Sequence, residues 1–281
     1  MEIANQPVIL TLNPRPGQSE AVLSEQQRGA IALVGSGEYT TAMGEVDSFL
    51  LDTLDGTARR VVVIPTASAL EPGMPQVWNE RGVRHFQALG AVATPLPLIM
   101  RDDALRPEIV AALEDGDFFY FSGGSPDYLI ETLRGTPAWA TILARHHAGA
   151  VLAGCSAGAM MMSGATLRVR EVVAGNDPRW VTAMGVVPNI AVLPHFDRMV
   201  DFAGAAVFTR IIATAPDAMT LVGVDEDTAL VGTLGGSGIS RWQVMGRQTV
   251  SVYSELAERM VYAVGDVVFL PARGEVRSNN E

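Results

Sequence analysis

The stretch that most constrains the fold of this chain lies at residues 149–164, where an apolar run gives way to very small residues. Residues 150–153 are apolar, residues 154–158 read Gly-Cys-Ser-Ala-Gly, and a helix-favouring Ala/Met segment follows. A strand can turn this sharply into a helix only if small residues flank the apex, because larger side chains would collide there. The pattern therefore predicts a buried strand, a tight turn with Ser156 at its exposed apex, and a helix that starts beside Ser156.

Ser156 is therefore a candidate nucleophile. Its hydroxyl would stand free at the end of the strand, and the unpaired N–H groups of the following helix would stabilise an oxyanion. Cys155 is the rival within the motif, since thiolates are the better nucleophiles. It occupies the second position of the turn, however, and we expect it to point back toward the sheet as a small buried side chain. The alternative interpretation is a packing turn in which Ser156 only caps the helix.

Apolar strand patterns alternate with helical patterns through the first two thirds of the chain. The predicted strands cover residues 31–34, 61–64, 91–98, 118–121 and 150–153, and the predicted helices cover 43–54, 77–89, 127–133 and 139–147. Strands that are apolar throughout, alternating with helices, indicate an α/β fold with a parallel sheet covered on both faces.

The chain is predicted to have three parts. Residues 1–29 form an N-terminal extension, with a candidate strand at 8–12, and residues 30–235 form the α/β core. Residues 236–281 form a β-rich region that packs on the same core, because short strand patterns joined by turns replace the earlier alternation. The strands predicted from residue 228 onward cover 228–231, 240–244, 249–253 and 266–270, with one short helix at 256–261.

Charge and cysteine content restrict the partners of the chain. The sequence has 20 Lys or Arg residues, all of them Arg, against 31 Asp or Glu residues, which gives a net charge of −11. This balance argues against nucleic-acid binding, and no apolar run is long enough to span a membrane. A single cysteine and an N-terminus unlike a signal peptide favour a soluble, cytoplasmic protein.

A serine nucleophile needs a base, and the chain has four histidines. We expect His85 on the surface, and His146 and His147 as cationic residues near a helix C-terminus. His195 follows the apolar stretch 190–193, at the carboxyl end of a predicted strand, where ligands gather in parallel sheets. It is the candidate base, with a buried histidine bonded to a carbonyl as the alternative.

The third group would be an acid that orients the imidazole. Residues 225–227 read Asp-Glu-Asp after a buried strand pattern, and in an extended segment Glu226 points away from the other two. Glu226 is therefore the candidate acid. Glu171, beyond the Ala/Met helix, is the rival, with a solvated ion pair to neighbouring arginines as its alternative role.

Taken together, four motifs resemble cyanophycinase and the dipeptidase E proteins of peptidase family S51. They are the Gly-Cys-Ser-Ala-Gly turn, Phe-Ser-Gly-Gly ending at Gly124, Pro-His-Phe around His195, and the Asp-Glu-Asp segment at 225–227. The resemblance implies a flavodoxin-like three-layer sandwich of the class I glutamine amidotransferase type, with Ser156 as nucleophile, His195 as base and Glu226 as acid. It also implies that the N–H groups of Gly123, Gly124 and Ala157 form the oxyanion hole, and that no metal or cofactor is needed.

The resemblance is incomplete on the substrate side. Cyanophycinases carry polar residues directly before the histidine, where this chain has Leu193 and Pro194. Arg198 is a candidate for binding a substrate carboxylate, with a surface arginine as the alternative. The sequence thus predicts a peptidase for small peptides, with aspartyl and isoaspartyl peptides as candidates, and permits a homodimer. A non-catalytic peptide- or small-molecule-binding protein is the alternative, whereas Gly-Ser-Gly at 35–37 is a weak signal for nucleotide binding.

Overall fold

The protein is described by a computed structural model that covers residues 28–271 except 55, 57–58, 218, 235–238 and 254–257. Its strands are β1 (Ile31–Val34), β2 (Arg60–Ile64), β3 (Val92–Pro95), β4 (Phe118–Phe121), β5 (Val151–Cys155), β6 (Ala165–Leu167), β7 (Trp180–Thr182), β8 (Ile190–Leu193), β9 (Thr220–Val224), β10 (Thr228–Gly232), β11 (Ile239–Gly246), β12 (Thr249–Tyr253), β13 (Arg259–Ala263) and β14 (Val267–Pro271). Its α-helices are α1 (Gly44–Asp52), α2 (Met74–Ala88), α3 (Pro107–Glu114), α4 (Pro126–Leu133), α5 (Pro137–His147), α6 (Ala157–Met162), α7 (Val169–Val173), α8 (Met199–Ala203) and α9 (Ala205–Ala213).

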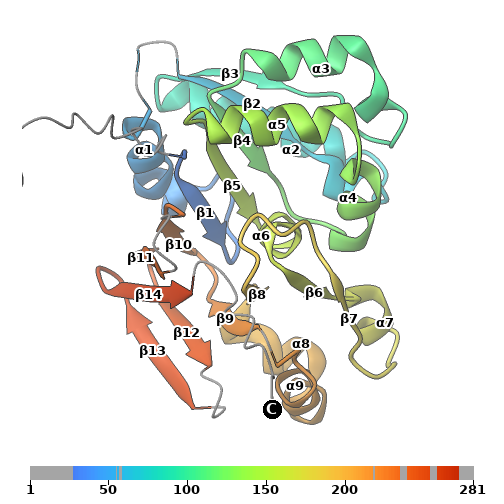
Figure 1. Ribbon diagram of the computed structural model, residues 1–281, viewed down its shortest axis with the longest axis vertical. Helices are drawn as coiled ribbons and strands as arrows, with labels where there is room; N and C mark the ends of the chain where they lie inside the picture. The colour runs from blue at the N-terminus through green and yellow to red at the C-terminus, as the bar shows by residue number, and fades with distance from the viewer. Residues whose placement is uncertain are drawn as a thin grey trace, which may run out of the picture.

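The centre of the molecule is an eight-stranded sheet with the order β14-β11-β10-β1-β5-β4-β2-β3. The strands from β1 to β3 in that order run parallel, whereas β10, β11 and β14 are antiparallel to their neighbours. In Figure 1, α3 and α5 lie in front of this sheet and α2 lies behind it. The predicted fold class is confirmed: the fold is a mixed α/β structure with a large, mostly parallel sheet and additional C-terminal strands.

Alternate residues of each parallel strand face opposite layers of helices, as the period of two in a strand requires. In β1, Ile31 and Leu33 belong to a core cluster shared with α3, α4 and α5. Ala32 and Val34 belong to a second cluster shared with α1 and α2. The continuous apolar strands are thus explained by burial on both faces, which makes the core a three-layer sandwich.

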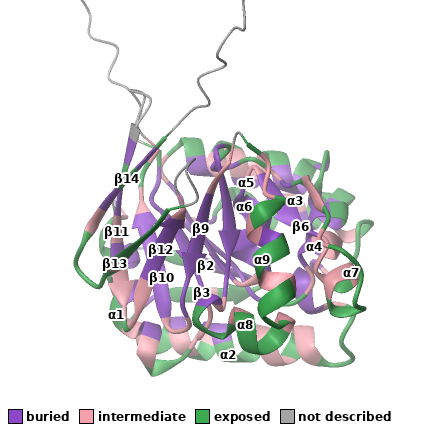
Figure 2. Cartoon of the chain, turned by 90° about the horizontal axis from the view of Figure 1, so that it is seen from below, coloured by how far each residue is buried: buried purple, intermediate pink, exposed green. Residues whose placement is uncertain are grey.

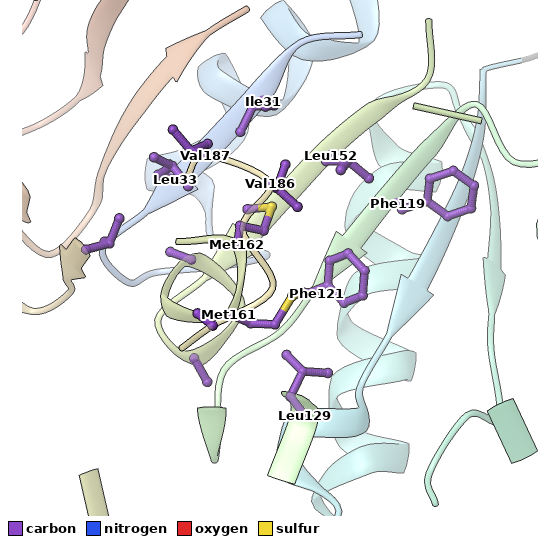
Figure 3. Close-up of a cluster of buried hydrophobic side chains, with 14 of the residues drawn as sticks. Ile31, Leu33, Phe119, Phe121, Leu129, Leu152, Met161, Met162, Val186 and Val187 are labelled. Carbon is purple, nitrogen blue, oxygen red and sulfur yellow. The ribbon is translucent and has the colours of Figure 1, made fainter. Parts of the chain in front are cut away.

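The helix α6 is anchored in the core by the methionines that follow the small-residue turn. Met161 and Met162 are fully buried among residues of β1, β4 and β5. Figure 3 shows Met162 beside Val186 and Met161 beside Phe121. Each buried methionine contributes about 2 kcal/mol of hydrophobic stabilisation, which holds the start of α6 in a fixed place.

The parallel strands end level with one another. Val34 of β1 pairs with Cys155 of β5, and Phe121 of β4 pairs with Gly154 of β5. The loops that leave β1, β4 and β5 therefore meet at one edge of the sheet, where the segments around Glu38, Gly123 and Ser156 converge.

A second, four-stranded sheet with the order β13-β12-β9-β8 packs against this edge. Strands β8 and β9 run parallel in register, so that their carboxyl ends, which precede His195 and Glu226, also lie side by side. Residues 225–227 carry the chain from β9 in the second sheet to β10 in the first. Figure 2 shows β9 as buried, whereas β13 is exposed at the outer edge.

One predicted element differs from the structure, and others lie outside its described residues. The helix predicted at 256–261 is wrong where the structure describes it, because residues 259–261 belong to β13, which pairs with β12. Val261 and Tyr262 favour a strand, and the pairing with β12 overrides the local helical pattern. The strand predicted at 8–12, residues 256–257 and most of the predicted N-terminal extension lie outside the described residues. Within the described part of the chain, no helix is both long enough and apolar enough to cross a membrane.

Candidate active site

The turn after β5 is built on close backbone contacts. A Cβ atom at Gly154 would lie 2.4 Å from the carbonyl carbon of Gly158, and one at Gly158 would lie 2.5 Å from the carbonyl oxygen of Phe121. Only glycine fits at both positions, as the sequence pattern predicts. Ser156 between them has a φ of +50°, a conformation that costs about 1–3 kcal/mol for a residue with a side chain. The strained apex carries the serine side chain away from β5 and α6.

The hydroxyl of Ser156 lies beside the imidazole of His195, with 3.1 Å between Oγ and Nε2. The other ring nitrogen of His195, Nδ1, lies 2.9 Å from Oε1 of Glu226. A carboxylate can only accept hydrogen bonds, so Nδ1 carries the proton and Nε2 is left to accept the hydrogen of Ser156. Both His195 and Glu226 are about one-third exposed, which leaves the pair open to a ligand from solvent.

The backbone around this pair is held by further hydrogen bonds that the sequence analysis did not anticipate. Asp197 accepts a hydrogen bond of 2.8 Å from the N–H of Glu226, and Gln248 donates one of 2.9 Å to the carbonyl oxygen of Glu226. Gln248 also reaches the carboxylate of Asp197 at 3.3 Å. No sequence motif marks these residues, because their roles depend on β12 lying beside β9.

Glu171, the rival acid, lies elsewhere. It stands on the short helix α7, where its Oε1 is 4.0 Å from Arg168 and 3.9 Å from Arg179. These distances fit a loose, partly exposed ion pair, the alternative role considered from the sequence. Among the described residues, the carboxylate that contacts His195 belongs to Glu226.

The loop after β4 supplies backbone donors near Ser156. A Cβ atom at Gly123 would lie 3.4 Å from Cβ of Ser156, so this loop touches the serine directly. The N–H of Gly123 donates a 2.9 Å hydrogen bond to Glu38, and that donor is therefore already used. The N–H groups of Gly124 and Ala157 make no hydrogen bond within the described part of the chain, so they remain as candidate oxyanion donors.

Cys155 is fully buried, as expected, but it has a polar partner. Its thiol lies 2.8 Å from Oε2 of Glu38. Burial and the nearby Glu38 carboxylate raise the pKa of the Cys155 thiol well above its ordinary value. The thiol therefore stays protonated at neutral pH, which argues against Cys155 as the nucleophile.

The expectations for two other histidines are wrong. His85 is not a free surface residue, because its Nε2 lies 2.8 Å from the fully buried carboxylate of Asp47. His146 is almost fully buried, and its Nδ1 lies 2.9 Å from the carbonyl oxygen of Ala150. Burial lowers the pKa of His146 to about 4, so it is neutral at pH 7 rather than cationic. The contact of His85 with Asp47 and the burial of His146 come from tertiary structure, which the helical pattern does not reveal.

Arg198 contacts the site through its backbone, whose N–H donates a hydrogen bond of 2.9 Å to the carbonyl oxygen of His195, while its side chain is bound elsewhere. Its guanidinium is 3.3 Å from Asp201 and stacks over the ring of Phe202 at 5.9 Å. The Phe202 ring in turn meets the His195 ring edge-on, with 6.0 Å between ring centres, and is 66% exposed. Phe202 thus forms an apolar surface beside His195, a feature that sequence analysis missed.

A hollow of about 260 Å³ opens next to the loop after β4, which carries Gly123 and Gly124. Ser125, which directly follows Gly124, is part of its lining, whereas Ser156 and His195 are not. Charged side chains of both signs surround the hollow, namely Asp127, Glu131, Arg168, Arg170 and Glu171.

Comparison with known proteins identifies the family. The model of peptidase family S51 matches residues 31–236 of the chain. The chain belongs to peptidase family S51. The match spans the segments that contain Ser156, His195 and Glu226.

Two solved structures described as peptidases are similar to this chain. The crystal structure of a peptidase from an acI-B1 Actinobacterium is 32% identical to this chain, with a TM-score of 0.77 over 88% of this chain and 98% of that one. A peptidase E candidate from Listeria monocytogenes EGD-e, at 19% identity, has a TM-score of 0.53 over 85% of this chain and all of its own, which shows a shared fold.

Two curated relatives are uncharacterized peptidases. One from Listeria innocua is 28% identical over half of this chain and 66% of its own length. One from Listeria monocytogenes is 33% identical over 37% of this chain. The matched segments thus span about two thirds and half of these relatives.

Proposed function

We propose that this protein is a serine peptidase that hydrolyses small peptides through an acyl-enzyme on Ser156. The observation that carries the proposal is the hydrogen-bonded chain from Ser156 Oγ through His195 to Glu226, at 3.1 and 2.9 Å. Such a chain activates a hydroxyl that is otherwise a weak nucleophile. Membership of a peptidase family supports the reaction class.

In the first half of the reaction, Oγ of Ser156 attacks the peptide carbonyl carbon while Nε2 of His195 takes the hydroxyl proton. The carbonyl oxygen becomes an oxyanion, which the N–H groups of Gly124 and Ala157 stabilise. His195 then gives its proton to the leaving nitrogen as the C–N bond breaks, and the acyl group stays on Ser156 as an ester.

In the second half, water attacks the ester carbon and gives a proton to His195. His195 returns this proton to Oγ of Ser156 as the acid product leaves. Glu226 keeps the imidazole in the required tautomer and stabilises its cationic form in both halves.

The hollow beside Ser125 supports small, charged peptides as substrates. Its volume of about 260 Å³ suits a molecule of a few residues rather than a folded protein. Arg168 and Arg170 would bind a carboxylate, including that of an aspartyl or isoaspartyl residue, and Asp127 and Glu171 would bind an ammonium group. A short zwitterionic peptide satisfies both signs of charge.

Covalent labelling with a fluorophosphonate tests this proposal. Oγ of an activated serine displaces fluoride from phosphorus, and intact mass measures the adduct. We expect one adduct on the unmodified chain, none on Ser156→Ala, and one on Cys155→Ala, because the thiol is not the group that reacts. A folded but unlabelled chain would contradict the proposal and favour the alternative, a binding protein without a covalent step. Screening of short peptides for hydrolysis follows a positive result.

A further inference from the structure

A buried carboxylate that the proposed reaction does not use lies beside the turn that carries the nucleophile. Glu38, just after β1, is 8% exposed. Its Oε1 accepts a hydrogen bond of 2.9 Å from the N–H of Gly123, and its Oε2 accepts one of 2.8 Å from the thiol of Cys155. A Cβ atom at Gly123 would lie 3.0 Å from Glu38 Oε1 and 3.4 Å from Cβ of Ser156. Glu38 therefore joins the oxyanion loop to the turn that carries the nucleophile.

This carboxylate is unusual in having no cationic partner. None of the ion pairs in the described part of the chain involves Glu38. Burying a carboxylate costs several kcal/mol unless it is paired or well hydrogen-bonded. The two hydrogen bonds offset part of that cost, and a residue kept at such a cost calls for a role.

The segment around Glu38 also contacts the loop that carries the acid. Gly35 donates a hydrogen bond of 2.9 Å to the carbonyl oxygen of Thr228, and the Cβ position of Gly37 is filled by a carboxylate oxygen of Asp227. The Gly-Ser-Gly stretch at 35–37 thus allows the chain to pass close to residues 225–228.

Backbone strain gathers around the same point. The non-glycine residues with positive φ in the described part of the chain are Tyr39, Arg59, Ser156, His195 and Asp227. All except Arg59 belong to loops around Ser156, and Tyr39 directly follows Glu38. Strain of this kind persists where the surrounding structure holds a functional geometry in place.

We propose that Glu38 is a positioning residue for the oxyanion hole. By accepting from the N–H of Gly123, it holds the Ser122–Gly123 peptide in place, and through that anchor it restricts the orientation of the following Gly123–Gly124 peptide, which carries the Gly124 N–H. By accepting from the thiol of Cys155, Glu38 also links the Gly123–Gly124 loop to the turn that carries Ser156. This inference rests on the proposed serine peptidase function, because it concerns the donors that stabilise the oxyanion.

Variants at Glu38 test the role through the rate of fluorophosphonate labelling and through kcat and KM for a hydrolysed peptide. Glu38→Ala removes both hydrogen bonds, and we expect labelling rate and kcat to fall about 10²-fold, with KM little changed. Glu38→Asp keeps the charge but is one carbon shorter, so it should lose most of the same activity. Glu38→Gln can still accept from Gly123 through its amide oxygen, and should recover activity to within about tenfold of the unmodified chain.

Asp117→Ala is the matched control. Asp117 also accepts from a backbone N–H, that of Arg60, but it lies at the amino ends of the strands, away from Ser156. We expect this variant to lose stability without a change in labelling rate. If Glu38→Ala and Glu38→Asp are labelled as fast as Asp117→Ala, the positioning role is wrong.

A crystal structure of Glu38→Gln and Glu38→Asp separates this inference from the proposed function. The inference requires that the Gly123–Gly124 peptide be rotated in Glu38→Asp and native-like in Glu38→Gln, and an unmoved loop in both would overturn it. If the unmodified chain is not labelled at all, the peptidase proposal fails. The position of the Gly123–Gly124 loop in the two variant structures then still decides whether Glu38 positions that loop.

Discussion

The two ends of the parallel strands use the same kinds of side chain in opposite ways. At the amino ends, His146 is bound to the carbonyl oxygen of Ala150, and Arg145 to that of Gly116. At the carboxyl ends, His195 is bound to another pair of side chains, Ser156 and Glu226. The first arrangement closes a helix and secures the fold, whereas the second leaves polar groups facing solvent in a strained backbone.

The comparison teaches that residue type alone does not mark a catalytic group. His146 and His195 are both partly or fully enclosed histidines near strand ends, yet only His195 has a hydroxyl on one nitrogen and a carboxylate on the other. Both histidines have an acceptor at Nδ1, so what distinguishes His195 is the hydroxyl of Ser156 at its Nε2.

The largest expected difference between the two ends of the strands is in the labelling rates of variants that lack His195 or His146. His195→Ala removes the group that accepts the hydroxyl proton of Ser156, so we expect fluorophosphonate labelling to slow by about 10³-fold or more. His146→Ala should destabilise the chain while its folded fraction reacts at the normal rate. The labelling rate, corrected for the fraction folded by circular dichroism, measures both. An equal loss of corrected labelling rate in the two variants would show that the two ends of the strands do not differ in their role.

A smaller effect is expected at the acid. Glu226→Gln replaces a carboxylate by a neutral amide, which has no charge to stabilise the cationic ring and whose NH2 group can hold Nδ1 in the wrong tautomer, so kcat should fall about 10²- to 10³-fold. Glu171→Gln, with only loose ion pairs to lose, serves as the control and should leave kcat unchanged. Steady-state hydrolysis of a short peptide compares them, and the reverse ranking would move the acid to Glu171.

The smallest expected effect concerns the free energy of unfolding that His146 contributes at the amino ends of the strands. Because burial lowers the pKa of His146 to about 4, the unfolded chain binds a proton near pH 6.5 that the folded chain does not. Stability from this residue therefore falls as the pH drops from about 6.5 to 4, by roughly 3 kcal/mol.

His146→Gln should remove this dependence, since glutamine does not titrate. Urea unfolding at pH 7 and pH 4.5 gives the free energy of unfolding for both chains. The variant should lose less stability between these pH values than the unmodified chain does. An equal loss in both would show that His146 is not buried in its neutral form.

Local sequence was sufficient where the structure depends on close approach of small residues or on strand periodicity. Gly154 and Gly158 predict the turn around Ser156 because no larger residue fits at their positions. The apolar runs of β1, β4 and β5 predict a sheet that is buried on both faces. Ser156, His195 and Glu226 each follow a strand pattern, and the structure places their side chains in contact. Their catalytic roles stay predictions.

Contacts between distant segments could not be predicted in the same way. Glu38 precedes Gly123 by 85 positions and Cys155 by 117, and nothing in its local pattern signals that both would bond to it. The second sheet, which brings Gln248 to the carbonyl of Glu226, also depends on pairing between separated strands.

The sequence by itself determined the layered α/β core and the sharp serine turn, because strand periodicity and the absence of side chains at glycine act over a few neighbouring residues. Tertiary structure alone decided which acid meets His195, which histidine is neutral and buried, and where Glu38 is bound. The acid at His195 and the place of Glu38 depend on hydrogen-bond partners from remote segments, and the neutral state of His146 depends on its burial. The folded packing creates all of these conditions.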